Sequence, residues 1–480
     1  MNLRKGLISI AAASVALGST LAQAQGLGVL RDAEMEEFLD DHTRPILDVA
    51  GIAPGSIHIL IINDGSFNAF AGGRYMGIHT GLLTTIDTPR QMEAIIAHEA
   101  GHLAGGHSVR SSDAIAAATR PMILSLVLAV GAIAAGAPQA GIGILGLGQN
   151  IGIANYLSYS RGQESATDQA SITYLDRLGH SSKGALEVWG KLRNAQIIRG
   201  RKINPYQQTH PMANTRLASL KRRVEASPYY DVEDSPEEIE RLILIQAKIR
   251  GFLHDPESTL RYYKEEDQSD AAHYGRAVAY FRLSEMDKAL IEVHVLTAKY
   301  PENPYYHELE GQMLFEYGRA KEAIAPHQLS IKLKPDNALL RLNLGRALLA
   351  TDELANTQEG VEEIKRALFL EPDNSFGWFE LARGYSTLGN DFMANLATAE
   401  SRYNAGDKAA ANQFARRAMI GLQRGTREWR QASDIILATQ PEEGGPPLPP
   451  GIEEPGPRKP DDNPRKRPDV PDPTFSDQSL

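Results

Sequence analysis

Hydrophobic and polar positions follow two different periods along the chain, and the change of period divides it into regions. Gly55 to Phe70 is rich in β-branched and aromatic residues and is broken by Asn63-Asp64-Gly65, which predicts a hairpin of two strands. The second strand is expected to continue through Ala71 to Leu83, with a turn or bulge at Gly72-Gly73. Met92 to Ala104 has the spacing of an apolar helix. Residues 25–230 therefore mix helices with one strand region.

A second region, made of helices and short turns, follows the turn-rich segment Ser227 to Pro236. Glu237 to Leu253 is expected to form an amphipathic helix, capped by Ser235 and with Pro236 at its first position. From there to about residue 437 the pattern is helix, turn, helix. We place a domain boundary at residues 230 and 231.

Prolines in similar short sequence segments indicate an internal repeat in this second region. They are Pro301, Pro335 and Pro372, spaced by 34 and then 37 residues. A small residue stands ten positions after each of them: Gly311, Gly345 and Ala382. This period is typical of the tetratricopeptide (TPR) repeat, in which small residues let two helices approach and proline ends the second helix. The longer spacing predicts a three-residue insertion near Leu354 to Gly360. An irregular helical bundle is the weaker alternative.

The most apolar segment, residues 122–147, is interrupted by several glycines and by Pro138. Because a membrane-spanning helix needs about 20 continuous apolar residues, we favour two helices packed within a globular domain. The alternative is a loop that dips into a membrane or covers an active site, and it would give the protein a peripheral membrane contact.

Both ends of the chain have the composition of segments outside a folded domain. Residues 1–24 combine Arg4 and Lys5, an apolar stretch and Ala22-Gln23-Ala24, which predicts a signal peptide cleaved after Ala24 rather than an uncleaved anchor. The mature protein is then expected to be exported. Residues 441–480 hold 12 of the 27 prolines and are expected to be disordered.

Composition narrows the chemistry that the folded regions can perform. The net charge is −10, which disfavours nucleic acid as a partner. The chain has no cysteine, so disulfides, thiolate metal sites, cysteine nucleophiles and acylated cysteine anchors are excluded. Any metal ion must therefore be held by histidines and carboxylates.

Such residues occur at metal-binding spacing in the helix of residues 92–104, which contains His98-Glu99-Ala100-Gly101-His102. Two histidines four positions apart project from one helix face and can hold one zinc ion. Glu99 follows the first histidine, where it can accept a proton from a water molecule activated by the metal and pass it to a leaving amine.

A third ligand is expected from Glu164, which has Asp168 one helical turn after it. One carboxylate can bind the metal while the other orients a ligand imidazole. An ordinary exposed acidic pair is the alternative. His107 lies one position short of the spacing that a third histidine would need after this motif, so we do not expect it to be a ligand.

His98-Glu99-x-x-His102 followed by Glu164-x3-Asp168 resembles the gluzincin peptidases of the CAAX-prenyl-protease and HtpX type. Thr209-His210-Pro211 with Arg216 looks like the His-Pro motif of this family, and Asn68-Ala69-Phe70-Ala71 is similar to its substrate-binding edge strand. A signal peptide, this peptidase domain and C-terminal TPR units together resemble periplasmic members that act on outer-membrane β-barrel proteins of Gram-negative bacteria.

The resemblance implies a role for each of these residues. His98, His102 and Glu164 would ligate one Zn²⁺ per chain, Glu99 would be the general base and acid, and Asp168 would orient a ligand. His210 would lie over the metal, either stabilising the oxyanion or closing the coordination shell in a latent state. Asn68, Ala69 and Phe70 would line the substrate.

We therefore expect a mostly α-helical protein with four segments. They are a signal peptide (1–24), an α+β zincin-type metallopeptidase domain with a small β-sheet (25–230), an α-solenoid of TPR repeats (231–440) and a disordered tail (441–480). The expected function is that of a periplasmic zinc endopeptidase, also chaperone-like, in quality control and assembly of outer-membrane β-barrel proteins. Its expected partners are unfolded or misassembled outer-membrane proteins and, through the TPR region, the β-barrel assembly machinery. The alternative is a non-proteolytic TPR chaperone or scaffold with a latent zinc site.

Overall fold

The computed structural model describes residues 28–106, 125, 129, 161–199, 210, 214–440 and 447–452. The first region contains β1 (Val29–Leu30), α1 (Ala33–Val49), β2 (His58–Ile62), β3 (Ala69–Gly72), β4 (Tyr75–His79), α2 (Thr80–Leu83), α3 (Pro89–Ala104), α7 (Arg161–Leu178), α8 (Lys183–Arg199) and α10 (Asn214–Glu225). The second contains α11 (Pro236–Leu253), α12 (Pro256–Tyr262), α13 (Asp270–Arg282), α14 (Met286–Lys299), α15 (Pro304–Glu316), α16 (Ala320–Leu333), α17 (Ala338–Leu349), α18 (Leu354–Leu370), α19 (Ser375–Thr387), α20 (Asp391–Asn404), α21 (Lys408–Met419) and α22 (Arg427–Thr439).

The small sheet has the strand order β1-β2-β4-β3, in which β2 and β4 are parallel and the outer pairs are antiparallel. The predicted hairpin across Asn63-Asp64-Gly65 is therefore wrong, because β2 and β3 are not neighbours. The carbonyl of Asp64 instead accepts hydrogen bonds from Thr80 and Gly81, so this loop is bound to the start of α2. The tight turn lies between β3 and β4, where Gly73 has a φ of +61°.

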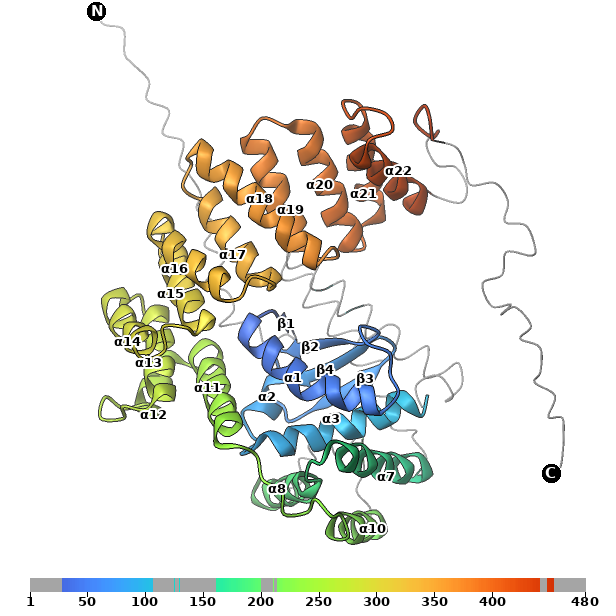
Figure 1. The fold of residues 1–480 in the computed structure, drawn as a ribbon, viewed down its shortest axis with the longest axis vertical. Helices are drawn as coiled ribbons and strands as arrows, with labels where there is room; N and C mark the ends of the chain where they lie inside the picture. The colour runs from blue at the N-terminus through green and yellow to red at the C-terminus, as the bar shows by residue number, and fades with distance from the viewer. Residues whose placement is uncertain are drawn as a thin grey trace, which may run out of the picture.

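The core of the first region lies between this sheet and the helices α1 and α3, with α7 and α8 beyond α3 (Figure 1). Thirteen of the sixteen residues of α3 are buried, among them every residue of the His98–His102 motif. A helix that is buried all round places its polar side chains inside the protein, where they need partners.

Helix α11 belongs to two cores. Leu242, Ile245 and Ile249 pack into the core of the first region, whereas Ala247 packs among the residues of α13 to α17. The expected helix is confirmed, and the side chain of Ser235 caps it by accepting a hydrogen bond from the backbone of Glu238. The physical boundary between the two regions is therefore a shared helix.

Helices α13 to α22 stack in antiparallel pairs along an arc that begins beside α11 and runs past the sheet (Figure 1). The repeat prediction is confirmed in its details. The asparagines that follow the marker prolines cap α15, α17 and α19: Asn303, Asn337 and Asn374. A Cβ on Gly311 would lie 2.8 Å from the ring of His327, and one on Gly345 would lie 2.5 Å from Ile364, so these glycines allow close helix approach. Helix α18 has 17 residues against 14 in α14 and α16, which is the expected insertion.

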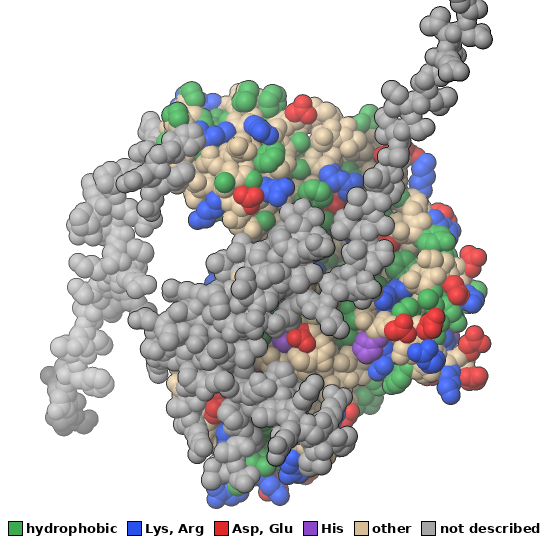
Figure 2. Space-filling view, turned by 180° about the vertical axis from the view of Figure 1, so that it is seen from behind, with side chains coloured by type: hydrophobic (Ala, Val, Ile, Leu, Met, Phe, Trp, Pro, Cys, Tyr) green, Lys and Arg blue, Asp and Glu red, His purple; other side chains and the backbone are tan. Residues whose placement is uncertain are grey.

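The N-terminal part of the first region contacts the repeats through charged groups. Arg31 donates to both carboxylate oxygens of Glu371, at 2.8 and 3.0 Å. Buried Lys248 of α11 lies 2.6 Å from Asp32 and 3.1 Å from Glu34. Figure 2 views the molecule from the side opposite to that in Figure 1. Over the described surface on this side, acidic and basic side chains also lie next to one another.

Several predicted features lie wholly or mostly outside the described residues. They are the signal peptide (1–24), His107, Thr209 and Pro211, the segment 122–147 except Ser125 and Ala129, and the tail except residues 447–452. Ala129 packs on Ile62 and Phe70 of the sheet. Within the tail, Leu448 and Ile452 pack against the last repeat, which differs from the expectation of a tail without packing. Among the helices of the described residues, none is long and apolar enough to cross a bilayer.

Candidate metal centre

Four buried side chains converge at the contact of α3 with α7. They are His98, His102, Glu164 and His210, and one nitrogen or oxygen from each lies within 4.8 Å of the others. Helix α3 supplies the two histidines one turn apart, and the first turn of α7 supplies Glu164. Sequence reasoning expected all four in one place, and the structure brings them together.

The nitrogen and oxygen atoms of these four side chains lie close to one another. His98 Nε2 lies 3.1 Å from His102 Nε2 and 3.3 Å from His210 Nδ1. Glu164 lies 3.4 Å from His102 Nε2 and 3.2 Å from His210 Nδ1. Two imidazole nitrogens that face each other need a shared proton or a cation between them. The geometry therefore fits a metal ion.

Asp168 and Arg216 support this cluster from behind. Asp168 Oδ1 lies 3.1 Å from His98 Nδ1, so the Nδ1–H can donate to it and leave the Nε2 lone pair directed at the cluster. Arg216 donates to both oxygens of Asp168, at 2.6 and 2.9 Å, and its third nitrogen lies 2.8 Å from Glu164. The guanidinium is buried and lies 5.9 Å from the ring centroid of Trp189. Arg216 thus fixes both carboxylates on α7.

The close approach of α7 to α3 depends on Gly101, the fourth residue of the motif. A Cβ at this position would lie 2.9 Å from Thr167 Cγ2 and 3.3 Å from the Thr167 carbonyl oxygen. Because the backbone oxygen cannot rotate away, a larger residue at 101 would separate the helices that carry the ligands.

Glu99 is 1% exposed and lies on the side of the cluster where the sheet edge passes. Its Oε1 is 3.3 Å from His210 Nε2, and the backbone of Ala71 in β3 hydrogen-bonds to its carboxylate. Burial raises the pKa of Glu99, although the neighbouring His210 and His98 oppose the rise. A carboxyl group with a raised pKa is suited to accept and return a proton near neutral pH.

The ligand residues themselves are strongly coupled. Burial disfavours the charged form of His98, but the hydrogen bonds that its ring donates to Asp168 and Glu164 outweigh burial and raise its pKa to about 9. Burial also acts against the carboxylate of Glu164, yet hydrogen bonds from His102 and His210 hold its pKa far below the usual range. Without a cation, the cluster would have to keep a proton to neutralise its carboxylates.

Strand β3 is the outer strand of the sheet, and no other strand of the described residues pairs with its free side. Asn68 precedes it, and Ala69 and Phe70 form its first two positions. Because Ala71 of the same strand contacts Glu99, this edge borders the cluster. The strand that contains two of the three residues proposed from the sequence to line a substrate therefore contacts Glu99 through Ala71.

The sequence pattern indicated no separate role for Arg216, which was named only as the arginine that follows the His-Pro motif at His210. Its partner Asp168 is 48 positions away, so no local pattern connects them. The available signal was chemical: a cluster rich in carboxylates within a core requires a buried cation as a partner.

Residues 33–224 match the family model described as peptidase family M48. A β-barrel assembly-enhancing protease of Escherichia coli (strain K12) is 27% identical over 390 residues, which is 79% of this chain and 77% of the relative. A β-barrel assembly-enhancing protease of Yersinia pestis is 25% identical over 359 residues, covering 72% of this chain and 71% of the relative.

Proposed function

We propose that this chain, whose residues 33–224 match the family model described as peptidase family M48, is a zinc-dependent endopeptidase of the periplasm. Its proposed substrates are unfolded or misassembled outer-membrane β-barrel proteins, because the relatives are named as proteases that enhance β-barrel assembly. We propose that the TPR region binds the assembly machinery or the client. The convergence of His98, His102 and Glu164 beside Glu99 carries the proposal.

The donor set favours zinc among the common metal ions. Zn²⁺ takes imidazole and carboxylate ligands in a tetrahedral arrangement at about 2.0–2.1 Å, which places neighbouring donors about 3.3–3.4 Å apart. Five of the six donor separations among the four residues range from 3.1 to 3.5 Å, and all of them lie within 4.8 Å. We propose that His98, His102 and Glu164 hold one Zn²⁺ per chain.

In the proposed mechanism, zinc supplies a Lewis acid that lowers the pKa of water and polarises the scissile carbonyl. The carboxylate of Glu99 accepts a proton from the attacking water and then delivers it to the nitrogen of the leaving amine. Asp168 keeps His98 in the tautomer whose Nε2 faces the cluster, and Arg216 keeps Asp168 and Glu164 ionised. The outer edge of β3 adds the substrate as a further strand, which reads its backbone and suits unfolded clients.

His210 occupies the fourth donor position in this arrangement, with Nδ1 within 3.3 Å of His98 and Glu164. A catalytic zinc site keeps one position open for water or substrate, whereas a structural site is closed. We therefore propose that His210 closes the site in a latent state and must move for cleavage. Once displaced, its ring could stabilise the oxyanion.

The same closed donor set favours the second candidate function, a chaperone or scaffold in which the zinc stabilises the fold. Glu99 distinguishes the two functions. A structural site has no use for a buried, unligated carboxyl group beside its first histidine, and this site has one.

A casein-cleavage assay on the mature protein tests the proposal. Glu99→Gln should keep about one zinc per chain and reduce cleavage by about 10²-fold or more, since a general base contributes that much. His210→Ala should raise basal cleavage if the ring closes the site. Full activity in Glu99→Gln, or a folded wild-type protein without zinc, would reject the proposed zinc-dependent peptidase activity. Unchanged activity in His210→Ala would reject both proposed roles of that histidine.

A further inference from the structure

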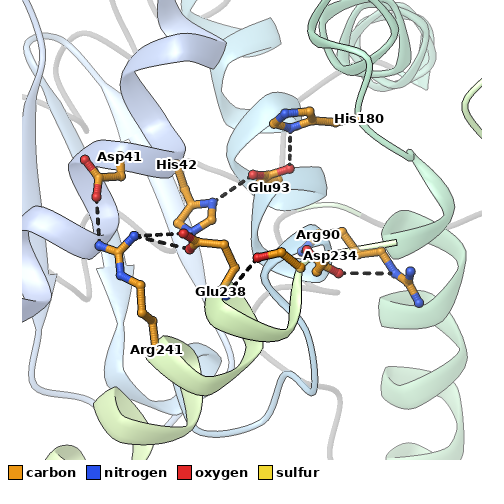
Figure 3. A network of polar contacts seen from close by, with 9 residues as sticks. Asp41, His42, Arg90, Glu93, His180, Asp234, Glu238 and Arg241 are labelled. Atoms are coloured by element: carbon orange, nitrogen blue, oxygen red, sulfur yellow. Dashed lines mark hydrogen bonds and ion pairs between the residues drawn. The ribbon is translucent and has the colours of Figure 1, made fainter. Parts of the chain in front are cut away.

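A second cluster of histidines and carboxylates lies outside the metal centre, where α1, α3, α11 and the turn after α7 meet. Figure 3 shows the polar contacts of this cluster, which we call the His42 network. Its members are Asp41, His42, Arg90, Glu93, His180, Asp234, Glu238 and Arg241. The proposed mechanism uses none of them.

His42 lies at the centre of this network and bridges two carboxylates. Its Nδ1 is 2.8 Å from Glu93 of α3, and its Nε2 is 3.0 Å from Glu238 of α11. Both ring nitrogens therefore face an oxygen at hydrogen-bond distance (Figure 3). A neutral imidazole has only one N–H, so it could satisfy only one of these contacts if both carboxylates are ionised.

Both carboxylates have reasons to stay ionised. Burial would raise the pKa of Glu93, but hydrogen bonds from His180 and His42 outweigh it and lower the pKa to about 2. Glu238 is partly exposed, and Arg241 lies 3.0 Å from one of its oxygens and 3.3 Å from the other. Ionised carboxylates only accept hydrogen bonds, so His42 must supply two donors.

The other groups around His42 are compatible with a positive ring. From its own helix, Asp41 pairs with Arg241 at 2.7 Å, which holds that guanidinium to the side of the ring. His180 contacts the second oxygen of Glu93 at 2.8 Å. Arg90 and Asp234 pair with each other at the edge of the network. The ring of Phe38 lies 4.7 Å from that of His42 and shields it from water.

The two carboxylates that contact His42 lie on helices that belong to different parts of the protein. Glu93 lies on α3, five positions before His98, and Glu238 lies in the first turn of α11, the helix shared with the repeat region. His42 is therefore the polar link between the metal-site helix and the helix on which the repeats are built.

We propose that His42 carries protons on both ring nitrogens and serves as a positioning residue, a charged latch that ties α3 to α11 and transmits displacements of the repeat region to the metal site. The latch itself does not depend on the proposed peptidase activity. Its two parts, the charge state and the transmission, are tested separately.

The charge state is tested by NMR on full-length protein labelled with ¹⁵N-histidine, with His42→Gln to assign the signal. At about pH 7.5, both ring nitrogens of His42 should show the shifts of imidazolium N–H groups. His254, whose pKa is lowered by partial burial and by the nearby Arg250 and Arg282, serves as the neutral control. A neutral tautomer of His42 at this pH would overturn the proposal.

Transmission is tested by hydrogen exchange of the same protein with Glu238→Gln, which keeps the side-chain shape but removes one charge. Backbone amides in the first turns of α11 and in α3 should exchange up to about 10-fold faster, the effect of losing a part-buried charged hydrogen bond. Glu240→Gln, an exposed substitution on the same helix, should leave both unchanged. Faster exchange in α11 alone would overturn transmission, and no change in either helix would overturn the latch.

Discussion

The metal centre and the His42 network are built from the same kinds of side chain, yet their atoms are arranged in opposite ways. In the metal centre, three imidazoles and Glu164 direct their donor atoms at one common point. In the network, both nitrogens of His42 and Nδ1 of His180 each face a separate carboxylate oxygen, at 2.8–3.0 Å. The first arrangement fits a metal ion at its centre, whereas the second is completed by protons between the nitrogens and the oxygens.

The difference teaches that composition alone does not identify a metal site. Both clusters contain two or more histidines and at least one buried glutamate. What separates them is whether nitrogens face nitrogens, as His98 and His102 do at 3.1 Å, or face carboxylates, as His42 does. Matched substitutions in the two clusters test this distinction.

The largest effect is expected from replacing one histidine in each cluster. His102→Gln should lower the bound zinc from about one per chain to well below that and strongly reduce cleavage, because only His98, Glu164 and the movable His210 would remain as donors. His180→Gln should keep both the metal and the activity. Metal analysis by mass spectrometry after dialysis measures the contrast. Equal metal loss in the two variants would show that the clusters do not differ as described.

A smaller effect is expected from the carboxylate that orients His98. Asp168→Asn should weaken zinc affinity by about 10- to 100-fold, since groups that orient a ligand contribute that much. Competition with a chelator of known affinity gives the value. Asp176→Asn on the same helix, whose side chain accepts a hydrogen bond from Ser227, is the matched control and should bind zinc as the wild type does. Identical affinities in both variants would contradict the role of Asp168.

The smallest effect is the pH dependence of the His42 network. Because Glu93 has a pKa of about 2 in the folded protein, below its ordinary 4.5, its contribution to stability is complete above about pH 4.5 and is lost as the pH falls. The pKa of His180 is raised by its hydrogen bond to Glu93, so its contribution is complete below about pH 6.5 and is lost as the pH rises through the raised value.

Urea unfolding of wild type and His180→Gln across this range measures the second contribution as a difference. The gap between them should be widest below about pH 6.5 and close at higher pH, and it should stay under about 1 kcal/mol because His180 is half exposed and screened by solvent. A gap that widens with rising pH would show that Glu93 does not stabilise the charged imidazole.

Those features of the site that repeat along one helix could be predicted from the sequence, and those that depend on pairing between distant segments could not. His98 and His102, or Glu164 and Asp168, are one turn apart, so the helix period alone brings them to one face. Arg216 and the members of the His42 network come from separate elements, and only the fold brings them together.

The same contrast holds for the fold. The period of the repeats was predicted because proline and small residues recur at fixed spacings, and the structure adds that an asparagine caps the helix after each marker proline. The strand pairing was not, because Asn63-Asp64-Gly65 has the composition of a hairpin turn but binds the start of α2. Which strand lies beside β2 depends on contacts with other elements rather than on the turn itself.

The shared position of α11 has a consequence for how the protein unfolds. Its apolar residues complete the core of the first region on one side and join that of the repeats on the other. Neither region can lose its order without exposing this helix to water, so the two should melt in one cooperative transition rather than as independent units. A fragment cut at residue 230 would leave the peptidase core without Leu242, Ile245 and Ile249, and one that keeps residues through 253 should be the shorter form that still folds.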